Sequence, residues 1–233
     1  MKTFIIRLEE NDHSCRMALE CKEQAAKFDI DADYFNAING LEADAHYKIT
    51  GVPRPIKAIK KGRPGVLGCF FSHYYLWSQC AEQSEPFCIL EHDGYFIRPL
   101  SEKILESFDD VLKLDGCDPY SPRYNQTIEA EKSLPVQIEK YKNPAPKALH
   151  KIGTGMYFKG AYSYILKPSG AKKLIDFIHT NKNGRGHRPA DQQIGDAVLD
   201  TKVTIPTIAR LHPFYAINGN INKMSLTGNV DLL

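Results

Sequence analysis

Two acidic residues, separated by one other residue, follow a short apolar run in the middle of the chain. Glu91 and Asp93 come directly after Phe87-Cys88-Ile89-Leu90. If that run is a strand, side chains at i and i+2 point the same way, so both carboxylates can face one ligand. Hard divalent cations prefer carboxylate oxygens, and a carboxylate can also accept hydrogen bonds from a ribose. The pattern predicts a site for a cation or a nucleotide, with a solvated loop as the alternative.

A third acidic residue, Asp191, follows a loop that is rich in Gly and in basic side chains. The loop contains Lys182, Arg185 and Arg188, and side chains of this kind can bind phosphates or another part of an acceptor. Pro189 and the apolar residues after Asp191 also suit the start of a helix. A helix cap is therefore the alternative role for Asp191.

The hydrophobic pattern predicts the elements that would bring these residues together. Apolar runs and alternation predict strands at 3–8, 34–38, 87–90, 136–138, 161–166 and 202–205. Three- and four-residue spacing predicts helices at 16–28, 67–81, 168–179 and 191–199. The first strand, helix and strand imply a parallel crossover. Prolines make the stretch at about 115–150 an irregular insertion in a single domain.

The composition is that of an ordinary globular domain. With 233 residues, of which 42% are hydrophobic and 25% charged, the chain can bury one sizeable core. The formal net charge of +2 does not by itself demand an anionic partner. Six cysteines without a Cys-x-x-Cys pair exclude a zinc knuckle. The sequence predicts reduced thiols, a cytoplasmic location and no transmembrane segment.

Several segments resemble glycosyltransferase family 25, which contains bacterial lipooligosaccharide galactosyltransferases and procollagen galactosyltransferases. The most specific is Gly68-Cys69-Phe70-Phe71-Ser72-His73, with Trp77 one turn later. Leu90-Glu91-His92-Asp93 is similar to the family's Leu-Glu-Asp-Asp, with His92 in place of the middle acid. Further similar segments are Phe4-Ile-Ile-Arg-Leu8, Arg16, Phe35-Asn-Ala-Ile-Asn-Gly40, residues 161–174 and Pro189-Ala190-Asp191. The resemblance implies an α/β fold of the GT-A type, a Rossmann-like sheet with helices on both faces.

The resemblance also implies a reaction and a metal. Family members are inverting enzymes that use a nucleotide-sugar donor, and inversion needs a carboxylate base for the acceptor hydroxyl; Asp191 is the candidate. Asp93 is the expected ligand for Mn²⁺ or Mg²⁺, and Glu91 is a second ligand or an acceptor for the donor's ribose or sugar. His212 is the candidate to complete the metal site, as a histidine does in many GT-A enzymes.

Five further residues are expected to contact the donor. Ser72 and His73 are expected to face the donor cleft, although a structural part is also open to them. Arg7 and Leu8 at the end of the first strand, and Arg16 on the next helix, are placed to touch the uracil, ribose or diphosphate. Salt bridges at the surface are the alternative for the two arginines. Trp77 is expected in the core.

The acceptor is open between a saccharide and modified DNA. The family's usual acceptors are lipid-linked saccharides or collagen hydroxylysine. Lys182, Arg185 and Arg188 form one basic loop, and residues 57–63 form another. If both share a face, DNA with hydroxymethylated bases becomes an acceptor candidate. A nonenzymatic glycan- or partner-binding protein is a further alternative, and a nucleotidyltransferase is disfavoured because no Gly-rich phosphate loop follows the first strand.

Overall fold

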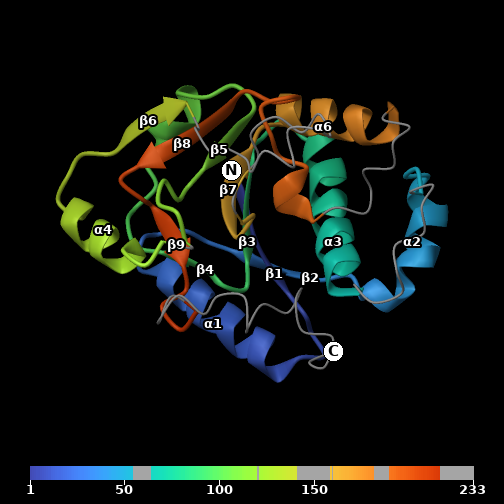
Figure 1. The fold of residues 1–233 in the computed structure, drawn as a ribbon, viewed down its shortest axis with the longest axis horizontal. Coiled ribbons are helices and arrows are strands. Elements are labelled where there is room, and N and C mark those ends of the chain that lie inside the picture. Colours follow the sequence, from blue (N-terminus) through green and yellow to red (C-terminus); the bar gives the residue numbers. More distant parts are fainter. Residues whose placement is uncertain (55–63, 120, 141–157, 159, 181–188, 216–233) are drawn as a thin grey trace.

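A seven-stranded mixed sheet forms the centre of the molecule (Figure 1). The computed structural model describes residues 1–54, 64–119, 121–140, 158, 160–180 and 189–215. The strand order is β2-β1-β3-β7-β5-β8-β6. The strands are β1 Lys2–Arg7, β2 Asp33–Asn36, β3 Phe87–Glu91, β5 Val111–Lys113, β6 Gln137–Lys140, β7 Ser163–Leu166 and β8 Thr201–Ile205.

The strand directions place several carboxyl ends at one edge of this sheet. β1 is parallel to β2 and to β3, which confirms the predicted crossover. β7 is antiparallel to both β3 and β5, and β5 is parallel to β8. The carboxyl ends of five strands therefore lie at the same edge of the sheet, namely those of β1, β2, β3, β5 and β8. In open α/β sheets ligands bind outside that edge.

Helices cover both faces, as predicted for the α/β fold. The main helices are α1 Asp12–Ala26, α2 Ala43–Thr50, α3 Pro64–Ala81, α4 Tyr124–Glu131 and α6 Pro168–Thr180. Alternate side chains of each strand point to opposite faces. Thus Ile5 packs with Ala18 and Cys21 of α1, whereas Ile6 belongs to the core that α3 and α6 form on the other face. Within the described residues, no helix combines the length and the apolar character needed to cross a membrane.

Local signals account for where the first helix starts and stops. The Asn11 side chain accepts a hydrogen bond from the amide of Ser14 at 2.8 Å, so α1 begins at Asp12, earlier than the apolar stripe predicted. Asp29 has a φ of 58°, a left-handed conformation that a helix cannot continue through. The predicted break after residue 28 is therefore confirmed.

Several short elements were not predicted, and one predicted helix is shorter. α2, α4, β5 and a two-stranded sheet of β4 Gly94–Phe96 with β9 Ala209–Leu211 are additions. The turns η1 Gly40–Glu42 and η2 Glu102–Glu106 are too. The helix expected at 191–199 is only the 3-10 turn η4 Ala190–Gln192. Beyond it, the carbonyl of Ile194 accepts from the amide of Phe158 instead of from the next helical turn.

Candidate active site

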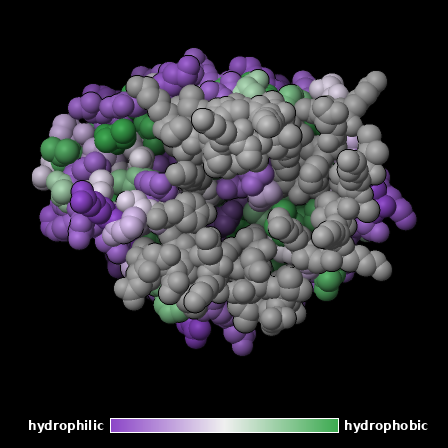
Figure 2. Space-filling view, viewed as in Figure 1, coloured by the Kyte–Doolittle hydropathy of each residue, from purple (hydrophilic) through white to green (hydrophobic). Residues whose placement is uncertain are grey.

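A cavity of about 230 Å³ lies at the carboxyl ends of β1, β2 and β3. Leu8, Ile38 and Glu91 line it from the strand side, and Cys69 and His73 line it from α3. Figure 2 shows a hollow on one face of the molecule in which hydrophilic and hydrophobic side chains both appear. The cavity combines apolar walls with a few polar groups, as binding sites for small molecules do.

Close packing between α3 and the end of β2 forms one wall of this cavity. A Cβ atom on Gly68 would lie 2.5 Å from the carbonyl oxygen of Ile38, so only glycine allows this approach. The hydroxyl of Ser72 donates to the carbonyl of Gly68 at 2.6 Å and accepts from the amide of Ile38 at 2.8 Å. Ser72 lines the cavity, and its hydroxyl connects α3 to the end of β2.

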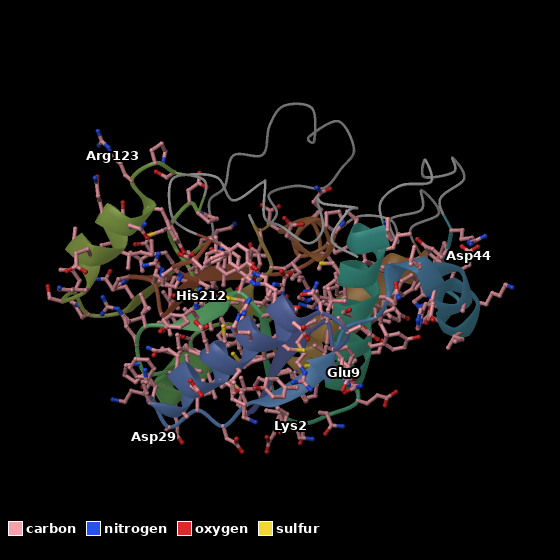
Figure 3. The ribbon with its side chains drawn as sticks, turned by 90° about the horizontal axis from the view of Figure 1, so that it is seen from below. Lys2, Glu9, Asp29, Asp44, Arg123 and His212 are labelled. Atoms are coloured by element: carbon pink, nitrogen blue, oxygen red, sulfur yellow. The ribbon has the colours of Figure 1, made fainter. Side chains whose placement is uncertain are left out.

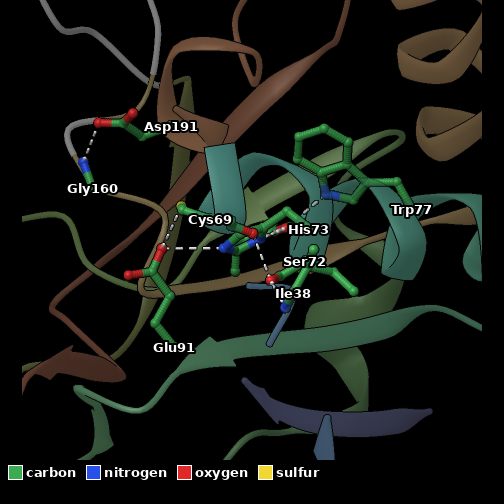
Figure 4. Close-up of polar contacts among 10 residues, drawn as sticks. Ile38, Cys69, Ser72, His73, Trp77, Glu91, Gly160 and Asp191 are labelled. Atoms are coloured by element: carbon green, nitrogen blue, oxygen red, sulfur yellow. Dashed lines mark hydrogen bonds and ion pairs between the residues drawn. The ribbon is translucent and has the colours of Figure 1, made fainter. Parts of the chain in front are cut away.

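Glu91 ends β3 and meets α3 inside the cavity (Figure 4). Its Oε1 lies 3.1 Å from His73 Nε2 and accepts from the Cys69 thiol at 3.8 Å. Burial alone would raise the pKa of Glu91, but the hydrogen bond from His73 and the nearby imidazoles of His73 and His92 outweigh it, so the pKa is lowered. Glu91 is therefore a carboxylate that accepts hydrogen bonds at neutral pH.

His92 replaces the acid between Glu91 and Asp93 with an uncharged ring. Burial lowers the pKa of His92 to about 4, so the imidazole is neutral at pH 7. Its Nε2 lies 3.4 Å from the hydroxyl of Tyr215, which also contacts Nε2 of His13 at 2.7 Å. The replacement removes a negative charge from the strand end and connects it to the segment after β9.

Asp93 is a carboxylate whose surroundings suit a cation ligand. Its Oδ1 is buried and has no hydrogen-bond partner among the described residues. Burial and the negative charge of Glu91 raise the pKa of Asp93 well above its usual range. A divalent cation would relieve both effects, since hard cations bind carboxylate oxygens. Asp93 thus fits the role of cation ligand that the sequence predicted, next to the charge of Glu91.

The described contacts of the His212 ring are with residues other than Asp93. Pairing of β4 with β9 brings the two backbones together, and the His212 amide donates to the Asp93 carbonyl at 2.6 Å. However, Nε2 of His212 lies 3.1 Å from Oε2 of Glu20 on α1, and Nδ1 accepts from the amide of Phe214 at 3.1 Å. Figure 3 shows His212 beside α1. In this arrangement both ring nitrogens have partners other than a metal.

Asp191 lies in η4, and one of its carboxylate oxygens lacks a partner. Oδ2 accepts from the amide of Gly160 at 3.2 Å, whereas Oδ1 is buried without a partner among the described residues. Pro189 holds the cap position of η4, so Asp191 is not its N-cap residue. Burial first, and then the charge of Glu91, raise the pKa of Asp191 to about 6. A carboxylate with such a pKa is suited to taking a proton near neutral pH.

Cys69 connects the cavity to Asp191. Its thiol contacts Glu91, and after burial the charges of Glu91 and Asp191 are what raise the pKa of this thiol. Asp191 itself is not among the residues that line the cavity. The carboxylate of Asp191 is therefore outside the cavity lining but close enough to Cys69 to act electrostatically on its thiol.

The predicted donor-binding residues divide into two groups. Leu8, Ser72, His73 and Glu91 line the cavity. Arg7 does not: its guanidinium lies 4.1 Å from the centre of the Tyr34 ring, on the opposite face of β1 from Ile6. The exposed Arg16 lies outside the lining as well, with Nη2 3.3 Å from Nδ1 of His13. The predicted acceptor residues Lys182, Arg185 and Arg188 lie outside the described residues.

Lys113 is a buried cation near Asp191 that the sequence interpretation missed. It is 1% exposed, and its Nζ donates to the Tyr162 hydroxyl at 3.5 Å. Burial lowers its pKa, and the charges of Asp115 and Asp191 partly offset this effect. A charged residue within the short apolar run Val111-Leu-Lys-Leu114 was the available signal, because a buried charge is rare without a partner.

Asp115, two residues after Lys113, is a buried carboxylate with many donors. It accepts from the hydroxyls of Tyr124 and Tyr162, from Thr207 at 2.8 Å and from the amide of Cys117 at 2.9 Å. A second cavity of about 240 Å³ lies beside this group at the ends of β5 and β8, and its lining includes Gly116, Asp118, Tyr124, Glu131 and Ile205.

Comparisons with known proteins point to one family. Residues 1–193 match the sequence model of the family described as glycosyltransferase family 25 (LPS biosynthesis protein). A protein of Aedes aegypti named glycosyltransferase 25 family member is 27% identical over 160 residues, which make up 63% of this chain and 24% of that protein. The chain thus spans about a quarter of the length of this relative.

A comparison with solved structures gives an alignment of low similarity. The apo form of mouse xyloside xylosyltransferase 1 is 11% identical in sequence and aligns with a TM-score of 0.38. The alignment covers 82% of this chain and 79% of the mouse chain.

Proposed function

The chain belongs to glycosyltransferase family 25, and from that premise we propose that it moves a sugar from a UDP-sugar onto an acceptor hydroxyl, with inversion at the anomeric carbon. The observation that carries the proposal is the carboxylate of Asp191 near Cys69, which has a buried oxygen without a partner among the described residues and a pKa of about 6. Such a group can accept the proton that the acceptor hydroxyl loses.

The cavity at the ends of β1, β2 and β3 is the proposed donor site. Leu8, Ala37 and Ile38 offer apolar surface for a nucleobase. Glu91 offers carboxylate oxygen to the hydroxyl groups of the ribose or the sugar. The position agrees with the general rule that nucleotides bind outside the carboxyl ends of parallel strands.

Asp93 is the proposed holder of a Mn²⁺ or Mg²⁺ ion, whereas Glu91 is assigned to the hydroxyl groups of the donor. The fit rests on Oδ1 of Asp93, which has no partner among the described residues, and on the nearby charge of Glu91, which raises the pKa of Asp93. When bound, such an ion supplies positive charge that stabilises the departing diphosphate. His212 is left out of the proposed ligand set, because Glu20 and the amide of Phe214 engage its ring.

Asp191 is the proposed base in a single displacement. As the acceptor oxygen forms its bond to the anomeric carbon, the bond from that carbon to the diphosphate oxygen breaks, and the electron pair leaves with the diphosphate. The proton of the acceptor hydroxyl moves to Oδ1 of Asp191. Attack opposite the leaving group inverts the anomeric configuration. The amide of Gly160 holds Oδ2, so the carboxylate keeps one orientation.

A saccharide is the proposed acceptor in preference to modified DNA. The second cavity lies at the same edge of the sheet as the donor cavity, and Asp118 and Glu131 contribute acidic side chains to its lining. Carboxylates accept hydrogen bonds from sugar hydroxyls, whereas they repel the phosphates of DNA. A lipopolysaccharide-type glycan agrees with the description of the family as LPS biosynthesis proteins.

Nucleotide release tests this function. The purified protein is incubated with manganese and a panel of UDP-, GDP- and CMP-sugars, either alone, with a saccharide mixture, or with DNA that contains hydroxymethylcytosine. We expect release of UDP that the saccharides stimulate and that Asp191→Asn removes. Stimulation by the modified DNA alone would replace the acceptor proposal. If no donor releases nucleotide under any condition, the nonenzymatic alternative is favoured.

A further inference from the structure

A buried row of hydrogen bonds runs from Trp77, in the last part of α3, to Glu91 at the cavity. The indole Nε1 of Trp77 lies 2.7 Å from the hydroxyl of Tyr164 on β7, and that hydroxyl lies 2.8 Å from Nδ1 of His73. His73 Nε2 then lies 3.1 Å from Oε1 of Glu91 (Figure 4). Trp77, Tyr164 and His73 are each 0% exposed. The row connects two strands and one helix without a solvent-exposed member before Glu91.

The chemistry of the first residue sets the direction of every hydrogen bond in the row. An indole N–H can only donate, so the Tyr164 oxygen accepts from Trp77. The Tyr164 hydroxyl then has its own proton to donate, and its other partner is Nδ1 of His73. Because Tyr164 donates to it, Nδ1 is the nitrogen without a proton, and the proton on Nε2 points at Glu91.

The direction has two consequences at Glu91. Its Oε1 must act as an acceptor, and it accepts hydrogen bonds from both His73 Nε2 and the Cys69 thiol. Among the described residues, Oε2 is then the oxygen left for a ligand. In addition, Cys69, His73 and Glu91 place three potential ligand atoms within 4.8 Å of one another, but Nε2 of His73 has no lone pair to offer. This group is therefore not arranged to hold a cation.

We propose that Trp77, Tyr164 and His73 are positioning residues that hold Glu91 as a fixed hydrogen-bond acceptor for a hydroxyl group of the donor nucleotide. The ligand in this proposal rests on the proposed function, whereas the hydrogen-bond row does not. A fixed acceptor loses little side-chain entropy when the ligand binds, and a carboxylate hydrogen bond is stronger than a neutral one. The signature Gly68-Cys-Phe-Phe-Ser-His73 and Trp77 thus act together, through Tyr164.

The chain offers a matched control in the same helix. Tyr74 on α3 lies 2.8 Å from Nε2 of His179 on α6, another buried tyrosine hydroxyl paired with a histidine. Tyr74→Phe removes a tyrosine–histidine hydrogen bond of the same type, between α3 and α6, but the described residues give it no contact with Glu91. Any effect specific to Tyr164→Phe therefore reports the row and not the general cost of losing a tyrosine hydroxyl.

The first test reads the row without any ligand. In protein labelled with ¹⁵N-histidine, the two ring nitrogens of His73, assigned by comparison with His73→Gln, report which one is protonated. We expect the Nε2–H form in the wild type and in Tyr74→Phe, and a mixture of tautomers in Tyr164→Phe. An Nδ1–H ring in the wild type would overturn the proposal, because His73 could then not donate to Glu91.

The second test measures UDP binding by calorimetry in the presence of manganese. We expect Tyr164→Phe to weaken UDP binding about tenfold, the loss of one charged hydrogen bond, and Tyr74→Phe to change it less than twofold. In a Glu91→Gln background Tyr164→Phe should have no further effect. Equal losses in the two tyrosine variants would contradict a positioning role. If the wild type binds no UDP, the proposed donor is wrong, and the tautomer measurement alone decides the row.

Discussion

Asp115 and Asp191 both act electrostatically on the buried ammonium group of Lys113, yet their own surroundings are opposite. Asp115 accepts hydrogen bonds from three hydroxyl groups and one amide. Asp191 accepts from the amide of Gly160 and leaves Oδ1 without a partner among the described residues. The unpartnered Oδ1 of Asp93 resembles the second case. A satisfied carboxylate stabilises the fold, whereas an unsatisfied one costs stability and is retained for chemistry.

The largest expected effect is that of Asp191→Asn on transfer. An amide cannot accept the proton of the acceptor, so we expect the rate to fall by about 10³-fold, while UDP binding stays within twofold. Initial-rate kinetics with the identified donor measure the first effect, and calorimetry measures the second. Asp176→Asn on the exposed side of α6 is the control with the same charge change. Full activity in Asp191→Asn would move the base to another residue.

A smaller loss of activity is expected from Asp93→Asn. Loss of a metal-binding carboxylate should lower manganese-dependent turnover by about 100-fold and weaken manganese binding. Titration of Mn²⁺ by electron paramagnetic resonance measures the free and bound ion directly. Unchanged manganese binding in Asp93→Asn would show that the cation binds elsewhere.

Asp115→Asn should lower the stability of the fold and spare activity, the reverse of what we expect from Asp191→Asn. The asparagine side chain would place an NH₂ group, which can only donate, against hydroxyl groups that now donate to the carboxylate. We therefore expect the free energy of unfolding to fall by about 3 kcal/mol, while the activity of each folded molecule persists. Chemical denaturation followed by circular dichroism provides the free energy. The comparison between the two acids fails if Asp115→Asn is as stable as the wild type.

The pH dependence of transfer is the mildest of these effects. The base must be ionised to work, and the pKa of Asp191 is raised to about 6. The value of kcat/KM should therefore be constant above about pH 7 and fall tenfold for each pH unit below 6. A profile that stays flat down to pH 5 contradicts this assignment. Stability changes in the opposite sense, because the folded protein holds this proton more tightly than the unfolded chain and loses stability as pH rises to about 6.

Long periodic segments were predictable from the sequence, and short ones were not. The predicted strand at 3–8 and helices at 67–81 and 168–179 correspond to β1, α3 and α6, because burial of one face imposes a period that a single sequence displays. β4 and β9 have three residues each and exist through pairing with each other across the chain. Three residues are too few to show a period.

The site residues divide along the same line. Glu91 and His73 were predictable as neighbours of the cavity because a strand end and a helix signature carry them. Arg7 could have been set aside from the period of two, since Ile6 and Leu8 line the cavity and Arg7 points to the other face. The orientation of His212 depends on Glu20, which lies 192 positions away, so no local pattern contains it.

The most direct test of the proposed base, the carboxylate of Asp191, is a titration of the aspartate side chains by ¹³C NMR. In the folded wild-type protein, we expect one aspartate carboxyl resonance to titrate with a midpoint near pH 6 and to be absent from Asp191→Asn. In that variant the free energy of unfolding at pH 7.5 should rise by about 1 kcal/mol, after allowance for solvent screening of a partly buried group. If the resonance of Asp191 titrates below about pH 4.5, as in an ordinary aspartate, the carboxylate is not prepared to act as a base and the proposed mechanism is wrong.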